Sequence, residues 1–283
     1  MIVRHATETD SDAITAILEA NDEPVVWPDV PRPPYVEHLL MRPRTRVVVG
    51  ELDRTVAGIA ASIEVGGPGR RFLSDLYVDP ARQSRGLGSA ILRAAFEGAD
   101  ERMTFSSSDP RALGAYIRNG MRPRWPLLYL EIAAGHLGPH DEGVVVRPAD
   151  VADTARLSLE WNGIDRTVDF AFYARLPEAS GFTVIVDGAE AAVGWARREL
   201  APPDGRWLDH ASIAPDANPV RAAFGVLRAA AGDDRLGAAV PGLHPAVAAL
   251  LERGVRIGGQ DTFCATDPNP FDPDRIFPSP GLL

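Results

Sequence analysis

Two hydrophobic periods alternate along the first half of the chain. Apolar residues spaced three and four apart share one face of a helix, whereas runs of branched and aromatic residues are typical of strands. The helical spacing predicts helices over Ser11–Glu19, over Tyr35–Met41, from Gly86 onward and over Pro110–Arg118. Strands are expected at Ile2–His5, Arg46–Glu51, Val56–Val65, Arg71–Val78, Arg102–Phe105 and Leu127–Ile132. This order predicts an α/β (α+β) fold with a mixed sheet, antiparallel at first, and a strand–loop–helix crossover in its middle.

The second half of the chain repeats the first. Arg71–Ala95 aligns without a gap with Arg206–Ala230, and both segments end in Leu-Arg-Ala-Ala. A shorter match joins Ile2–Ala6 to Val145–Ala149, and the matches occur in the same order in both halves. A repeat period of about half the chain indicates a duplicated domain rather than an array of short repeats.

A boundary between the copies is expected at Ala134–Gly143. This stretch, AGHLGPHDEG, contains glycine and proline and lacks a hydrophobic period, which is typical of a linker. We therefore expect domains at residues 1–133 and 144–283, each a mixed, mostly antiparallel sheet flanked by helices. The proline-rich tail Asp267–Pro280 is expected to be irregular and to lie over the surface.

Composition limits the classes of function. The 283 residues carry a formal net charge of −10 and no lysine, so the 29 basic residues are arginines. An acidic chain is a poor general binder of nucleic acid, and no apolar run reaches the roughly 18–20 residues that span a bilayer. The N-terminal sequence lacks a secretory signal pattern, and the single Cys264 cannot form an internal disulfide. We therefore expect a cytoplasmic protein without a nucleic-acid or membrane partner, and we predict no metal site.

One segment, Leu73–Ser89, carries recognisable chemistry. Its sequence LSDLYVDPARQSRGLGS joins a strand, a loop and the start of a helix, with Gly86 and Gly88 at the mouth of the helix. Free N–H groups and the helix dipole at such a mouth attract anions, and glycines let a pyrophosphate approach the backbone. Arg82 and Arg85 either add positive charge or are simply solvated. The segment is neither an ATP P-loop nor a dinucleotide fingerprint, because Gly-Lys-Ser/Thr and G-x-G-x-x-G are both absent here.

This segment resembles the cofactor motif of the GNAT acetyltransferase superfamily. Gln83-x-x-Gly86-x-Gly88 follows a strand and precedes a helix as in that family, and the resemblance extends over residues 1–133. It implies that the cofactor is acetyl-CoA, with its acetyl and pantetheine parts along the strand and its pyrophosphate on the amides of the loop. The implied strand positions are Leu76, Tyr77 and Val78. The implied loop positions are Gln83, Ser84, Arg85, Gly86, Leu87, Gly88 and Ser89.

The resemblance also implies a catalytic acid. Residues 112–121, ALGAYIRNGM, look like the family helix that carries a tyrosine shortly before a Gly-hydrophobic end, and Tyr116 is the matching position. A phenol near the sulfur can supply a proton as the C–S bond breaks. The alternative is a core tyrosine whose hydroxyl bonds a backbone group.

The base that deprotonates the incoming amine is less defined by the sequence. Asp75 lies on the key strand, on the face of Leu73 and Tyr77, and is the candidate that we retain. Other carboxylates are Glu64 on the preceding strand and two on the proline-rich loop, and a water chain is a further option. The loop carboxylates are Glu23 and Asp29, and His5 is interpreted as a strand residue without function. Trp27, Asp29 and Tyr35 either wall an acceptor site or pack against the neighbouring helix.

The second copy is expected to lack a working cofactor site. Gly86 aligns with Arg221 and Gly88 with Ala223, and Pro219 removes an N–H donor from the loop. The remaining matches place Asn218 at Gln83, His210 at Asp75, and Leu250 or Leu251 at the tyrosine. This copy either walls the acceptor site, stabilises the first domain or forms a subunit interface.

The expected activity is acetyl-CoA-dependent transfer of an acetyl group directly to a primary amine of a small molecule or a peptide. Two alternatives stay open, a non-catalytic acetyl-CoA-binding or regulatory protein and a transferase for a longer acyl group. A binder needs the glycine loop, whereas an enzyme also needs Tyr116 and a nearby base.

Overall fold

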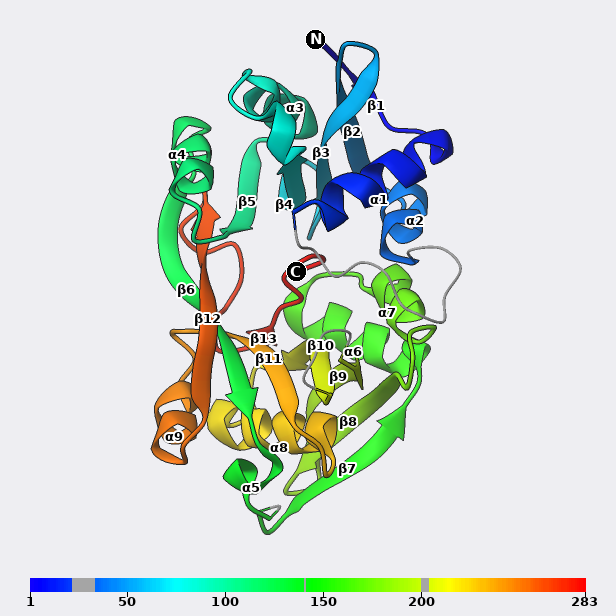
Figure 1. Ribbon diagram of the computed structural model, residues 1–283. Coiled ribbons are helices and arrows are strands. Elements are labelled where there is room, and N and C mark those ends of the chain that lie inside the picture. The colour runs from blue at the N-terminus through cyan, green and yellow to red at the C-terminus, as the bar shows by residue number, and fades with distance from the viewer. Residues whose placement is uncertain (22–33, 140, 200–203) are drawn as a thin grey trace. The chain divides into compact units, whose positions relative to one another are not determined.

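The computed structural model describes residues 1–21, 34–139, 141–199 and 204–283 (Figure 1). These residues form two compact units, each with its own core. Unit 1 consists of Met1–Phe105, Pro110–Arg122 and Cys264–Asp267, and unit 2 of Ser106–Asp109, Pro123–Phe263 and Pro268–Leu283.

Unit 1 contains a five-strand sheet in the order β1-β2-β3-β4-β5. Its strands are β1 (Ile2–His5), β2 (Thr45–Leu52), β3 (Thr55–Glu64), β4 (Arg70–Val78) and β5 (Glu101–Ser106). Neighbours pair antiparallel, except that β4 and β5 are parallel. The predicted mixed sheet, antiparallel at first, is therefore confirmed.

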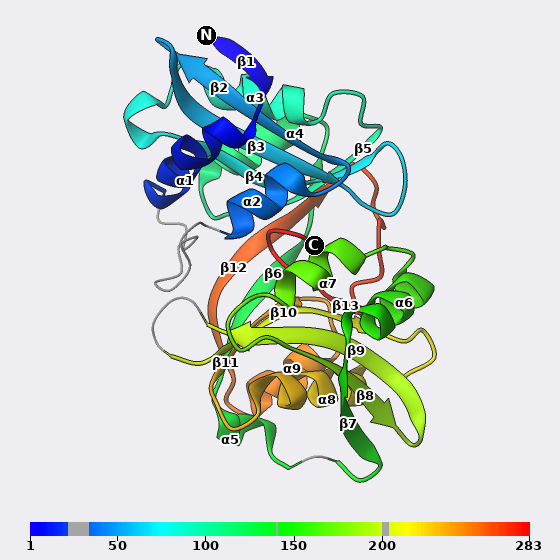
Figure 2. The ribbon, with the colours of Figure 1, turned by 90° about the vertical axis from the view of Figure 1, so that its right-hand side faces the viewer.

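Helices cover both faces of this sheet (Figure 2). They are α1 (Ser11–Glu19), α2 (Pro34–Met41), α3 (Leu87–Ala95) and α4 (Pro110–Arg118), with short 3₁₀ helices at Glu8–Asp10 and Pro80–Arg82. Because side chains alternate along a strand, Val48 and Gly50 of β2 face α3, whereas Val47 and Val49 face the other side. The α3 face is built on Leu87, Ile91 and Leu92, which share one side of the helix as the sequence pattern predicts.

Unit 2 repeats this arrangement of strands and helices. The strand order is β12-β6-β11-β10-β9-β8-β7, and β13 pairs with β10. The strands are β6 (Arg122–Ile132), β7 (Val144–Ala149), β8 (Ser180–Val186), β9 (Ala189–Arg198), β10 (Arg206–Ile213), β11 (Leu236–Pro241), β12 (Arg256–Ala265) and β13 (Ile276–Phe277). The helices are α5 (Ala134–Leu137), α6 (Val151–Asn162), α7 (Thr167–Tyr173), α8 (Pro219–Ala231) and α9 (Ala246–Glu252).

The compact units do not follow the two sequence repeats. Leu127–Ile132 of β6 was expected to close the first domain, but it pairs antiparallel with Leu236–Pro241 of β11 in unit 2. In turn, Thr266 from the second repeat belongs to unit 1, where its N–H donates to Arg102 O at 2.9 Å. Every strand must pair its backbone N–H and C=O groups. Duplicated strands carry the same backbone donors and acceptors, so the strand of either repeat can serve as the partner. The boundary at 134–143 stays a prediction about the repeats, and the short helix α5 lies inside that expected linker.

The expectation of an irregular surface tail over Asp267–Pro280 is wrong for its second half. Ile276 and Phe277 form β13 along β10, and each is only 1% exposed. Their apolar side chains belong to the buried core of unit 2. Burying a large apolar side chain stabilises the fold by about 1.5–3 kcal/mol.

No helix in the described ranges is both long enough and apolar enough to cross a membrane.

Candidate active site

The centre of unit 1 is a point where two parallel strands separate. The parallel pairing of β4 with β5 ends at Leu73, opposite Thr104, whereas β4 continues to pair with β3 as far as Val78. The register shifts at this point, because Leu73 lies opposite Ser62 and Asp75 opposite Ala61. Ser74 is therefore the extra residue of a β-bulge, a feature that redirects neighbouring side chains and is frequent beside active sites.

The loop after β4 presents backbone N–H groups at the start of α3. Ala90 N donates to Gly86 O at 3.2 Å, and this is the first hydrogen bond of the helix. The N–H groups of Leu87, Gly88 and Ser89 therefore have no partner within the helix, which leaves them available to hydrogen-bond an anion. Gly86 has φ +79° and no atom within 4 Å of the place that a Cβ would take, so the backbone is open there.

Several side chains of the loop have partners of their own within unit 1. Asp79 accepts from Ala81 N at 2.9 Å and so closes the 3₁₀ turn at Pro80–Arg82. Arg82 Nη1 donates to Leu52 O at 3.2 Å, while the Arg85 side chain is 60% exposed. Arg85 is thus the cation of the loop that a phosphate can recruit without breaking a strong contact, since its nearest carboxylate, that of Asp53, is 4.0 Å away.

Gln83 is held by its side chain. Its Oε1 accepts from Arg111 Nη1 of α4 at 2.7 Å. The sequence motif singled out Gln83 without indicating this contact, which ties the loop after β4 to α4. The sequence analysis missed this contact of Arg111, because its spacing from Gln83 along the chain carries no signal.

A tyrosine and an aspartate meet beside the bulge. Tyr35 of α2 donates its hydroxyl to Asp75 Oδ2 at 2.9 Å, and Asp75 is 6% exposed. Burial and the negative charge of Asp75 raise the pKa of Tyr35 well above 10, so the phenol remains a proton donor at neutral pH. Asp75 was predicted as a catalytic residue, and the structure adds Tyr35 as its partner.

Tyr116 lies on α4 and is 6% exposed within the core of unit 1. It packs in the same apolar cluster as Leu87 at the start of α3 and Leu73 at the end of the β4–β5 pairing. The side chain thus belongs to the same core as these two features, and its burial is also what a core tyrosine would show.

Two further residues considered from the sequence have other surroundings in the structure. Glu64 pairs with Arg44 at 3.4 Å, and His5 is exposed on the edge strand β1. Glu23, Trp27 and Asp29 lie outside the described residues, so their predicted part in an acceptor wall stays a prediction.

Comparison with known families supports this interpretation of the fold. Residues 14–121 match the model of the acetyltransferase (GNAT) family, a range that contains β2 to β5, the glycine loop and α4. Residues 14–121 therefore form a GNAT-family domain. Members of the GNAT family are N-acetyltransferases that use acyl-CoA, so the protein is an acyltransferase.

Solved structures extend the GNAT fold to both units. A Pyrococcus horikoshii protein named "putative acetyltransferase" has a TM-score of 0.72 and 16% identity, over 98% of this chain and 93% of that one. A tandem GNAT protein from the clavulanic acid biosynthesis pathway has a TM-score of 0.62 and 14% identity, over 96% and 99%. A GCN5-related N-acetyltransferase from Anabaena variabilis has a TM-score of 0.64 and 13% identity, over 93% of this chain and 72% of that one. These identities establish the fold alone. No curated protein matches the sequence.

The second GNAT copy has replaced the loop with a helical turn. α8 begins at Pro219, three residues before the position that matches the start of α3. Asn218 Oδ1 accepts from Val220 N and Arg221 N, both at 3.1 Å, and Asn218 O accepts from Ala222 N, the match of Leu87 N, at 3.0 Å. These amides of the second copy are therefore already bonded within the protein. Arg221 pairs with Asp187 and donates to Glu142 O. The structure therefore agrees with the expected loss of the site from this copy.

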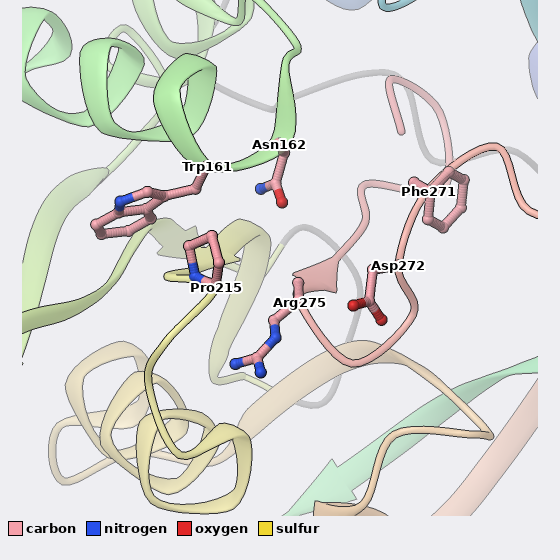
Figure 3. A pocket seen from close by; sticks show the side chains of 6 residues that line it. All are labelled: Trp161, Asn162, Pro215, Phe271, Asp272 and Arg275. Atoms are coloured by element: carbon pink, nitrogen blue, oxygen red, sulfur yellow. The ribbon is translucent and has the colours of Figure 1, made fainter.

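A separate cavity of about 250 Å³ opens in unit 2 (Figure 3). Its lining is Trp161, Asn162, Pro215, Phe271, Asp272 and Arg275. It contains none of the site residues predicted from the sequence. The volume lies below the roughly 300–1,000 Å³ of typical small-molecule sites, so the cavity is too small for an acyl-CoA.

Proposed function

We propose that unit 1 transfers an acetyl group from acetyl-CoA directly to a primary amine of a small molecule or a peptide. The observation that carries this proposal is the combination of two features on one strand. β4 separates from β5 at a bulge, and the loop that follows it ends in amides without helical partners at Leu87–Ser89. The first feature opens a strand edge for an extended substrate, and the second binds its phosphates.

The residues of unit 1 fit such a substrate. Gly86 leaves open space beside the loop, and the exposed Arg85 supplies a positive charge in a chain that is acidic overall. The proposed pyrophosphate contacts are the backbone amides of Gln83–Ser89. The proposed contacts for pantetheine and the acyl group are the backbone of Leu76, Tyr77 and Val78.

The chemistry follows from groups beside the bulge. The thioester supplies the acyl group, and backbone N–H groups of β4 are proposed to polarise its carbonyl. Asp75 is the proposed acceptor of the amine proton, with Tyr35 fixing Oδ2 by the 2.9 Å hydrogen bond. Tyr116 is the proposed donor that protonates the departing thiolate. Positioning of the two substrates accounts for much of the acceleration.

The proposal is tested by thiol release from acetyl-CoA across a panel of small amines, aminoglycosides and peptides. Gly86→Arg is expected to abolish turnover and coenzyme A binding, because its side chain fills the open space and the backbone there has φ +79°. Gly98→Arg is the matched control. Gly98 also has positive φ (+71°) and open surroundings, but it follows the opposite end of α3. The Gly98→Arg variant should retain both turnover and coenzyme A binding.

Tyr116→Phe separates an enzyme from a binder. A proton donor acts on the chemical step, so kcat should fall about 10²-fold or more while coenzyme A binding is unchanged. Tight binding without turnover on any amine would favour the regulatory alternative. Absence of coenzyme A binding in calorimetry would contradict the proposal.

A further inference from the structure

The second unit repeats the strand separation found in the first. β10 pairs with β11 only over Arg206–Leu208, and its register against β9 shifts between Leu208 and His210. Asp209 is thus the extra residue of a bulge. In the repeat alignment Leu208 matches Leu73, and Asp209 matches Ser74, the bulge of β4. The second copy has therefore kept the opened strand edge although its glycine loop is lost.

Matching amides point to this edge in both units. Asp79 N donates to Ala57 O on β3, and its counterpart Ala214 N donates to Ala191 O on β9, both at 2.9 Å. Because N–H groups alternate along a strand, Val78 N and Ile213 N point the opposite way, toward the side from which β5 or β11 has departed. Ile213 N donates to Arg275 O of the C-terminal tail at 2.9 Å.

The tail lies along the opened edge of β10. Ser212 is opposite Ile276 and Ala211 is opposite Phe277 in an antiparallel ladder. In the repeat alignment, Ala211 and Ser212 match Leu76 and Tyr77. Figures 1 and 2 show β13 beside β10 and β11 of the same unit.

Both ends of this segment are anchored within unit 2. Arg275 Nη1 donates to Ala214 O at 3.0 Å and to Ala217 O at 2.7 Å, in the loop that matches the cofactor loop. At the other end, Arg166 Nη1 donates to Leu282 O at 3.2 Å. Between these anchors, Phe277 packs on the His244 ring at 5.0 Å between centroids. The anchors are backbone and core contacts, so the segment is part of the folded unit.

We propose that Arg275–Leu283 is a built-in peptide occupant of the second cofactor cleft, and that each chain therefore binds one acyl-CoA. The tail takes along β10 the position that acyl-CoA takes along β4, an equivalence that rests on the function proposed for unit 1. The second unit has exchanged a dissociable ligand for a covalently attached strand. The occupant fills the opened edge with main-chain hydrogen bonds and two buried apolar side chains.

Amide hydrogen exchange on the full-length protein tests the occupancy. The Ile213 amide should be protected in the free protein and unchanged by coenzyme A, because its acceptor is Arg275 O. The Val78 amide should exchange about 100-fold more slowly when coenzyme A is present at about 100 times Kd. Fast exchange at Ile213 in the free protein, or protection that appears only with coenzyme A, overturns the proposal.

A disulfide tether supplies a second test. The bond from Ile213 N to Arg275 O makes Ser212 and Ile276 a non-hydrogen-bonded pair, whose side chains lie closest across a ladder. Ser212→Cys/Ile276→Cys should form a disulfide without ligand, and calorimetry should give one coenzyme A per chain in the oxidised and reduced protein and in the wild type. Ser212→Cys alone controls for the lost hydroxyl. Failure of the cysteines to bond, or two sites in the wild type that become one in the oxidised variant, overturns the proposal.

Failure of the proposed function has a different signature. A Val78 amide that never responds to coenzyme A contradicts the site in unit 1 and the count of one acyl-CoA. Protection of Ile213 and formation of the tether would still establish the tail as the occupant of β10.

Discussion

The hydroxyl of Tyr35 donates a hydrogen bond to Oδ2 of Asp75 across 2.9 Å, from α2 to the strand that carries the β-bulge. The pair joins a helix on one face of the sheet to the point where β4 and β5 separate. Because burial keeps the phenol protonated, the hydrogen bond has a fixed direction and orients the carboxylate.

Tyr35→Phe is expected to lower both stability and activity. Removal of one partner leaves a buried carboxylate with one donor fewer, which costs about 1–3 kcal/mol of unfolding free energy. Turnover should fall further than the loss of folded protein explains, because Asp75 is no longer oriented. Urea unfolding at pH 7 and thiol release under identical conditions measure the two effects.

Tyr129→Phe is the matched control for this variant. Tyr129 OH donates to Asp261 Oδ2 at 2.7 Å in unit 2, so the same chemical change is made in the unit that does not carry the proposed site. It should lower stability by a similar amount and retain kcat. Equal losses of kcat in the two variants would show that the Tyr35–Asp75 pair has only a structural role.

A second prediction concerns two glycines, Gly50 on the strand that packs against α3 and Gly88 in the first turn of α3. A Cβ at Gly50 of β2 would lie 2.3 Å from Leu87 Cδ1 and 2.9 Å from Ile91 Cγ2, so Gly50→Ala forces these two side chains of α3 to shift. We expect a loss of about 1–3 kcal/mol in unfolding free energy and weaker coenzyme A binding.

Gly88→Ala should separate folding from binding. The nearest atom to its Cβ is Val78 Cγ2 at an ordinary 3.6 Å, and alanine is the better helix former. Stability should therefore be unchanged or higher, while the methyl group at the helix mouth weakens coenzyme A binding by about tenfold, or ~1.4 kcal/mol. Unchanged affinity in calorimetry would place the phosphates elsewhere.

His244 should make stability dependent on pH. Burial is the main cause that lowers its pKa from 6.5 to about 4, so between these values the unfolded chain binds a proton that the folded chain does not. Stability therefore falls as the pH decreases from 6.5 toward 4, and the share of His244 amounts to about 3 kcal/mol. The lowered pKa of His210 acts in the same direction.

His244→Asn tests this contribution. In the wild type, His244 Nδ1 accepts from Ala246 N at 3.2 Å. An asparagine offers its side-chain oxygen as the acceptor in place of Nδ1, but an asparagine does not titrate. Unfolding free energies at pH 7 and pH 4.5 should differ less in the variant than in the wild type, with the remainder coming from other groups. An identical pH dependence would exclude His244 as a contributor.

The sequence alone determined the local structure and the nature of the loop. The predicted helix Ser11–Glu19 coincides with α1, and the strand expected at Arg71–Val78 with β4 to within a residue. These features depend on the spacing of apolar residues and on the conformations that glycine and proline allow, both of which are local properties. The duplicated fold could also be predicted from the sequence, because the two repeats share local patterns of residues.

Tertiary structure decided which distant groups meet. β6 was predicted close to its observed position, yet its partner β11 was not, because the pattern of a strand describes its faces and not its edges. The hydrogen bond from Tyr35 to Asp75 spans 40 residues, and the contact of Arg275 with Ala217 spans 58. The same limit applies to the tail. Its prolines indicate irregular structure, but the opened edge of β10 offers unpaired main-chain groups, and the need to pair them draws Ile276 and Phe277 into the core.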